Sequence, residues 1–196
     1  MADSTAPRAS WISPKLEARP SPAHGMGLYL RAGAELEPDE IVTVAGGRIF
    51  PGEYEHPQDH AFSAAPGFLI APLGEADIDY LMNHSCEPNC GMAGSVAWCA
   101  MRRLVGPAEL TYDYCMGEAW DDWTFPCCCG APTCRGKVTG WDWQDPRLQE
   151  RYWGYFAPHV EARILAQRLG PDWRARLRAF ALGARATPET LPRSPA

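Results

Sequence analysis

The segment from Phe125 to Gly136, FPCCCGAPTCRG, restricts the fold more than any other part of the sequence. The C-x-C-x4-C spacing of Cys127, Cys129 and Cys134 suits a metal ion better than a disulfide. Tetrahedral zinc usually takes four such ligands. Cys128 lies between two neighbouring cysteines and is poorly placed to join them on one ion. Three ligands are therefore visible here, and the fourth must come from elsewhere in the chain.

The bulk composition is that of one ordinary globular domain. The chain has 196 residues, of which 46% are hydrophobic and 21% charged, enough for a single core with small additions. The first residues, MADSTAPRAS, lack the basic start and apolar stretch of a signal peptide. We therefore expect an intracellular protein, cytoplasmic if the source is bacterial and nuclear or cytoplasmic if it is eukaryotic. In such a reducing compartment, clustered cysteines favour a metal over disulfides.

The charge balance indicates which partners to expect. The formal net charge is −6, and the basic surface that nucleic-acid binding usually requires is not visible. No apolar run reaches the length of a membrane span. We expect no direct nucleic-acid partner and no membrane partner, whereas an acidic surface attracts a basic protein or peptide. Nothing in the sequence bears on the oligomeric state.

Short strands separated by turns are expected over the first two thirds of the chain. They are predicted at Trp11–Ile12, Gly27–Leu30, Ile41–Val44, Phe68–Ile70, Val96–Met101 and Leu110–Tyr114. Residues 51–66, with proline at both ends, are predicted to form a loop.

Helices are expected after the cysteine segment. Asp145 and Pro146 predict a helix start, with aspartate as N-cap and proline at the first helical position. Apolar residues then follow helical spacing from Tyr152 to Leu165, with interruptions at Gly154 and Pro158. A second helix is predicted near residues 172–182, and the last dozen residues are expected to be mobile.

Four other cysteines, Cys86, Cys90, Cys99 and Cys115, are candidates for the missing ligand. Cys86 lies in LMNHSCEPNC, residues 81–90, a polar loop that follows an apolar lead-in. A simple capped turn is the alternative interpretation of that stretch.

Four motifs together resemble SET-domain protein lysine methyltransferases that carry a post-SET zinc segment. They are HGMGLYL at 24–30, NHSCEPNC at 83–90, ELTYDY at 109–114 and CCCGAPTCRG at 127–136, in the order found in that family. The resemblance covers roughly residues 11–140. Any one motif would be weak, but their order and spacing are specific.

The resemblance implies a mainly β fold, the SET-domain or β-clip fold, in which the NHSC and ELTYDY segments are threaded past one another. A zinc-binding post-SET lobe and a C-terminal helix complete it. We expect a flexible leader at 1–10, a SET domain at 11–117, a post-SET segment at 118–140, a helical extension at 141–182 and a flexible tail at 183–196.

In such proteins the cysteine after Asn-His-Ser joins the C-x-C-x4-C set on one structural zinc ion. Here the resemblance implies the ligands Cys86, Cys127, Cys129 and Cys134. A site with four cysteines is closed and has no open position for a substrate. The free energy of metal binding would add to the free energy of folding, because the ion would hold the C-terminal segment against the NHSC loop. Unliganded buried thiols are the alternative.

The family's cofactor is S-adenosylmethionine, and the resemblance implies a binding site for it. Gly25, Met26 and Gly27 match the loop whose backbone approaches the cofactor. Asn83 and His84 match the pair that contacts it, although a structural hydrogen-bonding role is the alternative for His84. In the family, an apolar or aromatic residue after the zinc segment packs against the adenine, and Trp141 is the candidate here. Packing against the C-terminal helix is the alternative for Trp141.

Two tyrosines carry the implied chemistry, methyl transfer to the side-chain amine of a protein lysine. Tyr114 matches the family's catalytic tyrosine and is also expected to contact the cofactor; a plain core tyrosine is the alternative. Tyr112 occupies a substrate-channel position that influences how many methyl groups are added. Because a tyrosine hydroxyl can hold a water where a methylated amine would need to rotate, we expect mono- or dimethylation. Asp113 is expected to have a structural role.

The chain also departs from the family pattern. VAGGRI at 44–49 stands where many of these enzymes have tyrosine-x-glycine-glutamate, with Val44 and Gly47 in place of the tyrosine and glutamate. Two rival hypotheses follow. One is a catalytically silent SET-like module that binds a basic protein tail, and the other is a zinc scaffold that supports an assembly.

Overall fold

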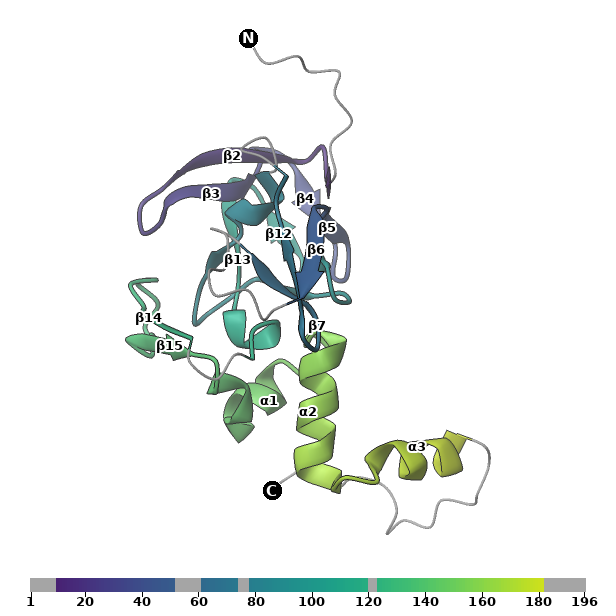
Figure 1. Ribbon diagram of the computed structural model, residues 1–196. Helices are drawn as coiled ribbons and strands as arrows, with labels where there is room; N and C mark the ends of the chain where they lie inside the picture. Colours follow the sequence, from purple (N-terminus) through teal and green to yellow (C-terminus); the bar gives the residue numbers. More distant parts are fainter. Residues whose placement is uncertain (1–9, 52–60, 74–77, 120–122, 182–196) are drawn as a thin grey trace. The chain divides into compact units, whose positions relative to one another are not determined.

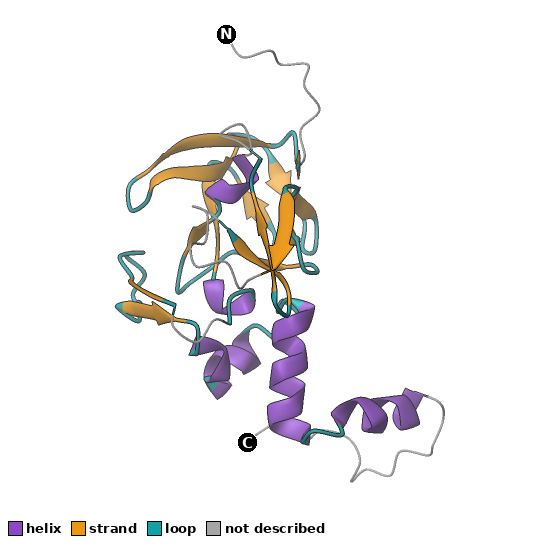
Figure 2. Cartoon of the chain, in the orientation of Figure 1, coloured by secondary structure: helices purple, strands orange, loops and turns teal. Residues whose placement is uncertain are grey.

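The computed structural model describes residues 10–51, 61–73, 78–119 and 123–181, and β-strands are the main element of this part of the chain (Figure 2). The expected flexible tail at 183–196, and the expected leader apart from Ser10, lie outside the described residues. None of the described helices is long and apolar enough to cross a membrane.

The elements follow one another as strands first and helices last. The strands are β1 (Trp11–Ile12), β2 (Leu16–Ser21), β3 (Gly25–Leu30), β4 (Glu35–Leu36), β5 (Ile41–Val44), β6 (Arg48–Pro51), β7 (Phe62–Ala65), β8 (Phe68–Ala71), β9 (Asn83–His84), β10 (Cys90–Met92), β11 (Ala97–Ala100), β12 (Leu104–Val105), β13 (Ala108–Tyr112), β14 (Thr124–Pro126) and β15 (Lys137–Thr139). The helices are the 3₁₀ turns η1 (Ile78–Leu81), η2 (Tyr114–Met116) and η3 (Asp142–Gln144), and the α-helices α1 (Pro146–Arg151), α2 (Pro158–Leu169) and α3 (Trp173–Ala181).

One sheet has the strand order β2-β3-β13-β9, and the β2–β3 hairpin forms its long outer edge (Figure 1). β13 pairs antiparallel with β3 on one side and parallel with β9 on the other. Along β13, Leu110 and Tyr112 are buried, while Glu109 and Thr111 are only half-buried. This alternation is typical of a strand with one face on the core. The sheet therefore brings the GMG, NHSC and ELTYDY motifs together.

The predicted strand at Leu110–Tyr114 ends two residues early. Asp113 caps η2 instead, because its carboxylate accepts a hydrogen bond from the Cys115 amide at 3.2 Å. An aspartate that bonds the backbone two residues ahead competes with strand pairing. Tyr114 consequently lies in a tight turn and not on the flat face of the sheet.

A second sheet has the order β1-β5-β11-β10 and a third has the order β6-β8-β7. Two further two-stranded sheets pair β12 with β4 and β14 with β15. The strands predicted at Trp11–Ile12, Ile41–Val44, Phe68–Ile70 and Val96–Met101 are confirmed within a residue or two. The loop predicted at 51–66 is wrong at its end, because Phe62–Ala65 forms β7. Phe62 pairs with Ile70 on β8, and its ring lies against Trp98 at 5.2 Å. This packing overrides the turn signal of the nearby prolines.

The departure at Gly47 has a steric reason in the structure. A Cβ atom at this position would lie 2.1 Å from the carbonyl oxygen of Ala71 and 2.8 Å from the hydroxyl of Tyr80. That hydroxyl donates to the carbonyl of Gly46 at 2.6 Å. A glutamate therefore does not fit here, and Tyr80 fills the space beside the backbone.

The helix start predicted at Asp145 and Pro146 is confirmed. Asp145 caps α1, and its carboxylate accepts from the Arg147 amide at 2.9 Å. The helical spacing predicted from Tyr152 to Leu165 is wrong at its start, since α1 ends at Arg151 and residues 152–157 form a link to α2, which begins at Pro158. The second predicted helix is confirmed as α3. Residues 1–160 and 161–196 form two compact units, and the boundary between them falls inside α2.

The link between α1 and α2, residues 152–157, is hydrogen-bonded to β10 and to η2. The Met92 amide donates to the carbonyl of Tyr155 at 3.0 Å, and the Ala157 amide donates to the carbonyl of Met116 at 2.7 Å. His159 hydrogen-bonds with the carbonyl of Gly117 at 2.8 Å. Two backbone hydrogen bonds from the link, and one side-chain bond from the start of α2, therefore hold this region against β10 and η2.

We predict that Gly91→Ala weakens this docking. A Cβ at Gly91 would lie 2.6 Å from the Cβ of Tyr155, so the link must shift. Overpacking of this kind costs about 1–3 kcal/mol in the free energy of unfolding, measurable by urea denaturation. Gly117→Ala is the matched control, because its nearest new contact is an ordinary 3.7 Å to Met92. Equal stability losses in the two variants would contradict the docking.

Candidate functional site

The NHSC segment runs beside β13 and is fixed to it by hydrogen bonds. Beyond the β9–β13 pairing, the Ser85 amide donates to the carbonyl of Tyr112 at 3.1 Å. The side chain of Asn89 extends the ladder, since its amide donates to the carbonyl of Glu109 at 2.7 Å and its oxygen accepts from the Thr111 amide at 3.0 Å. The loop that carries Cys86 is thus held between two hydrogen-bonded ends.

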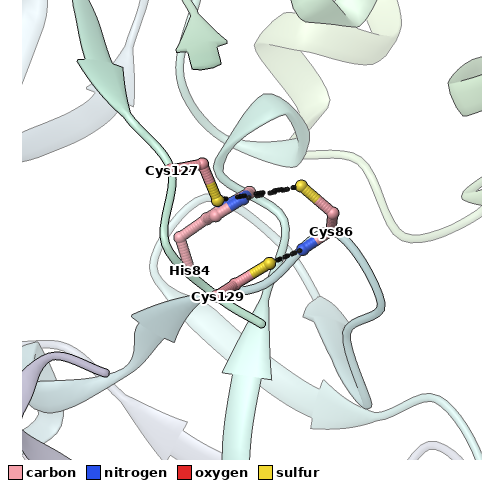
Figure 3. A group of neighbouring side chains, drawn as sticks. All are labelled: His84, Cys86, Cys127 and Cys129. Atoms are coloured by element: carbon pink, nitrogen blue, oxygen red, sulfur yellow. Dashed lines mark hydrogen bonds between the residues drawn. The ribbon is translucent and has the colours of Figure 1, made fainter. Parts of the chain in front are cut away.

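Figure 3 shows four side chains that converge on one point from the NHSC loop and the cysteine segment: His84, Cys86, Cys127 and Cys129. Their potential ligand atoms all lie within 4.8 Å of one another. The sulfurs of Cys86 and Cys127 are 3.9 Å apart. A tetrahedral zinc ion with Zn–S bonds of about 2.3 Å would set its sulfurs about 3.8 Å apart. The spacing of these two thiols therefore fits a shared zinc ion.

Cys134, the fourth cysteine of the predicted set, lies beside this group. Its thiol donates to the carbonyl of Cys127 at 3.7 Å and accepts from the Gly136 amide at 3.4 Å. The structure therefore places three of the four predicted ligands in one cluster with His84, and the fourth next to them.

His84 faces Cys86 with one ring nitrogen and Tyr114 with the other. Nδ1 accepts from the Tyr114 amide at 3.3 Å, and Nε2 lies 3.4 Å from the sulfur of Cys86. Burial lowers the pKa of His84 to about 4, so the ring is neutral near pH 7. A neutral ring whose Nδ1 accepts must carry its proton on Nε2. His84 is therefore a hydrogen-bond donor to the Cys86 sulfur, in the manner of groups that surround metal ligands.

The clustered thiols differ in acidity. Burial raises the pKa of Cys86 to about 11, against the opposing effect of the Arg135 amide. Burial also acts to raise the pKa of Cys129, but the amides of Cys86 and Ala131 outweigh it and lower the value to about 7. Zinc binds thiolates, so loading the site would release protons.

Arg135 joins the cysteine segment to the end of the ELTYDY motif. Its guanidinium donates two hydrogen bonds to Asp113, at 2.6 and 2.8 Å, and one to Asp142 at 3.1 Å. Its backbone amide donates to the sulfur of Cys86 at 3.4 Å. Asp113 is fully buried, which agrees with the structural role expected for it. The sequence reasoning missed Arg135, whose only signal was a cation next to a ligand cysteine.

Tyr114 lies in a group of aromatic rings. Its hydroxyl donates to the carbonyl of Met82 at 3.3 Å, and burial raises its pKa, so the phenol stays protonated. The surrounding ring centroids are those of Tyr112 at 4.9 Å, His84 at 5.2 Å, Phe125 at 5.8 Å and Trp123 at 6.0 Å. The sequence reasoning missed Trp123 and Phe125, which the cysteine segment brings from outside the four motifs.

The GMG segment lies next to Asn83. The Asn83 side-chain amide donates to the carbonyl of Met26 at 2.9 Å, and Gly25 has a φ of 76°, a backbone conformation that favours glycine. Met26 and Trp141 both have substantially exposed side chains, and Trp141 lies at the start of η3. The cofactor roles of these residues stay predictions.

Several curated proteins are similar to part of this chain, although no family model matches it. A histone-lysine N-methyltransferase of Eremothecium gossypii, H3 lysine-4 specific, is 41% identical over 139 residues, 59% of this chain and 14% of the relative. A Schizosaccharomyces pombe protein of the same description is 43% identical over 78 residues, 36% of this chain and 8% of the relative. Histone-lysine N-methyltransferase trithorax of Drosophila virilis is 28% identical over 130 residues, 57% of this chain and 3% of the relative. The chain thus spans between 3% and 14% of the length of these relatives.

Solved structures share the fold. KRYPTONITE in complex with mCHG DNA and SAH matches with a TM-score of 0.53 and 24% identity, over 65% of this chain and 30% of that one. The methyltransferase domain of human histone-lysine N-methyltransferase SETMAR matches with a TM-score of 0.50 and 18% identity, over 63% of this chain and 57% of that one. The predicted mainly β SET fold is confirmed. The homologues of this chain are SET-domain histone-lysine methyltransferases, and the chain itself has the SET-domain fold.

Proposed function

We propose that this protein transfers a methyl group from S-adenosylmethionine to the side-chain amine of a lysine in a basic protein. The observation that carries the proposal is the position of Tyr114, whose hydroxyl points at the Met82 carbonyl inside a group of aromatic rings. The NHSC and GMG motifs share a sheet with β13, the strand that leads into the turn of Tyr114. The names of the relatives and the SAH in a structural neighbour support the same reaction.

The residues of the chain supply alignment and a dry environment for this reaction. S-adenosylmethionine, held by the GMG segment and Asn83, would supply an electrophilic methyl group; the lysine nitrogen would take the methyl carbon as the sulfur–methyl bond breaks, with S-adenosylhomocysteine as the neutral thioether product. The amine must be neutral to attack, although free lysine has a pKa of about 10.4. A narrow apolar channel would disfavour the ammonium form, so the proton would pass to water before the attack. The Tyr114 hydroxyl would then orient the reacting groups.

The proposed substrate is a histone-like or other basic protein. The net charge of −6 favours a basic partner. A KRYPTONITE structure that resembles this chain, with a TM-score of 0.51, contains an H3(1-15) peptide and also DNA. The expectation of no direct nucleic-acid partner therefore stays a prediction, as does the intracellular location. The target lysine is left open by the proposal.

We also propose that one structural zinc ion binds Cys86, Cys127, Cys129 and Cys134. The clustering of Cys86 with the first two thiols supports the set. His84 competes with Cys134 for the fourth position, but its Nε2 proton points at the sulfur of Cys86. Bound there, zinc would supply a fixed cation for the thiolates and take no part in the reaction.

The first prediction from this proposal concerns Tyr114→Phe. We expect methyl transfer to mixed core histones, followed with a labelled cofactor, to fall by about a hundredfold, because the hydroxyl no longer orients the reacting groups. Binding of S-adenosylhomocysteine by calorimetry should persist, which shows that the site is still formed. Undiminished methylation by the variant would contradict the role of Tyr114, and no cofactor binding by the parent protein would favour the silent binding module.

A second prediction concerns the metal. The purified protein should contain one zinc per chain by elemental analysis. Cys86→Ser should lose it, with a stability loss of several kcal/mol in urea, because metal binding energy is folding energy here. Cys128→Ser is the matched control, since its exposed thiol lies outside the cluster and donates to the Ala23 carbonyl at 3.6 Å. Zinc retained in the Cys86 variant would overturn the ligand set.

A third prediction concerns the product. Tyr112 is buried, and its ring centroid lies 5.5 Å from that of Trp98 and 4.9 Å from that of Tyr114, so its ring belongs to the aromatic group. Mass spectrometry of exhaustively methylated substrate should show mono- or dimethyl-lysine, and Tyr112→Phe should shift the product toward a higher degree. Trimethyl-lysine as the main product of the parent protein would contradict the role of Tyr112.

A further inference from the structure

The carboxylate of Glu109 accepts three hydrogen bonds on the half-buried face of β13. The hydroxyls of Ser21 and Tyr29 donate to its Oε2, each at 3.0 Å. The side-chain amide of Asn83 donates to its Oε1 at 2.9 Å. In the described part of the chain Glu109 forms no ion pair, so this carboxylate is bound by neutral donors alone. A carboxylate can only accept hydrogen bonds, and all three neighbouring groups donate to it.

The contacts of Asn83 determine how its amide group is turned. The Nδ2 atom donates to Glu109 Oε1 and, at 2.9 Å, to the carbonyl of Met26. Both partners are acceptors only, so the reversed amide would place an oxygen against two oxygens. With Nδ2 engaged twice, Oδ1 faces away from both. Among the described residues no hydrogen bond reaches this Oδ1, which leaves it as an acceptor for a ligand.

Gly27 provides the space for this pair. A Cβ atom on Gly27 would lie 2.4 Å from Glu109 Oε1 and 3.0 Å from Asn83 Nδ2. Because Gly27 has no side chain, the Glu109 carboxylate and the Asn83 amide have room to form their hydrogen bond next to β3. This requirement is separate from the close approach of the backbone to a ligand.

We propose that Glu109 is a positioning residue of the cofactor site, which acts by holding the Asn83 amide in one orientation. In that orientation Oδ1 can accept from the protonated amino group of the cofactor but cannot bind its carboxylate. Glu109 thus sets which part of the cofactor's amino-acid end lies at Asn83. The inference rests on the proposed function, since it assumes that the cofactor binds here.

A double-mutant cycle on ligand binding tests this role. Calorimetry would measure the affinity of the full chain for S-adenosylhomocysteine and for methylthioadenosine, which lacks the amino-acid end. Glu109→Leu removes the acceptor and should weaken S-adenosylhomocysteine binding by about tenfold. In an Asn83→Ala background, Glu109→Leu should lower the affinity for S-adenosylhomocysteine by less than about twofold, because Glu109 acts through Asn83. Methylthioadenosine affinity should change by less than about twofold in both backgrounds.

Glu17→Leu is the matched control. Glu17 lies on β2 opposite Tyr29, in the same sheet, but pairs with Arg19 and Arg31 and not with Asn83. It should leave both affinities unchanged. If Glu109→Leu does not fold, Tyr29→Phe takes its place in the experiment. It removes one hydroxyl donor from the Glu109 carboxylate and should lower the affinity for S-adenosylhomocysteine by about two- to threefold.

The outcomes separate the inference from the proposed function. An equal loss from Glu109→Leu in both backgrounds, or an equal loss for both ligands, would mean that Glu109 only supports the sheet and would overturn the inference. A parent protein that binds neither ligand would overturn the cofactor site itself, and the inference with it.

Discussion

The contact between the NHSC loop and the cysteine segment is the constraint on which the rest of the site depends. Arg135 forms it in two ways, since its backbone amide bonds the sulfur of Cys86 and its guanidinium neutralises the buried Asp113. Removing one partner of such a buried pair typically costs about 3–5 kcal/mol, because the other charge is left without compensation. The ion pair and the thiol cluster therefore act on the same two segments. A bound zinc ion would add its energy to a junction that the protein side chains already define.

This junction determines the surroundings of Tyr114. The turn that holds Tyr114 begins at Asp113, and the backbone amide of Tyr114 bonds the ring of His84 beside Cys86. Phe125 lies on β14 at the start of the cysteine segment, and its ring contacts both His84 and Tyr114. The proposed zinc site would take no part in the proposed reaction, but its candidate ligands lie next to the surroundings of Tyr114. Closing the cysteine segment onto the loop also completes the aromatic group around the phenol.

Much of this arrangement could be predicted from the sequence, because the motifs are local and their chemistry is specific. The spacing of Cys127 and Cys129 indicated a metal site, and Asp145 with Pro146 indicated the start of α1. What the sequence could not indicate were contacts between distant segments. The strand at Phe62 depends on pairing with Ile70, and the roles of Arg135 and Glu109 depend on partners at Asp113 and Asn83. The sequence shows the charges of Arg135 and Glu109, but only the fold shows which groups contact them.

X-ray absorption at the zinc edge of the purified protein tests the central claim most directly, because it reads the ligand atoms around the metal. The account predicts a first shell of sulfur alone at about 2.3 Å, as expected for Cys86 together with the three cysteines of the later segment. A shell that includes nitrogen at about 2.0 Å would place His84 on the metal in place of a cysteine. That result would contradict the all-cysteine junction and the donor role assigned to the His84 ring.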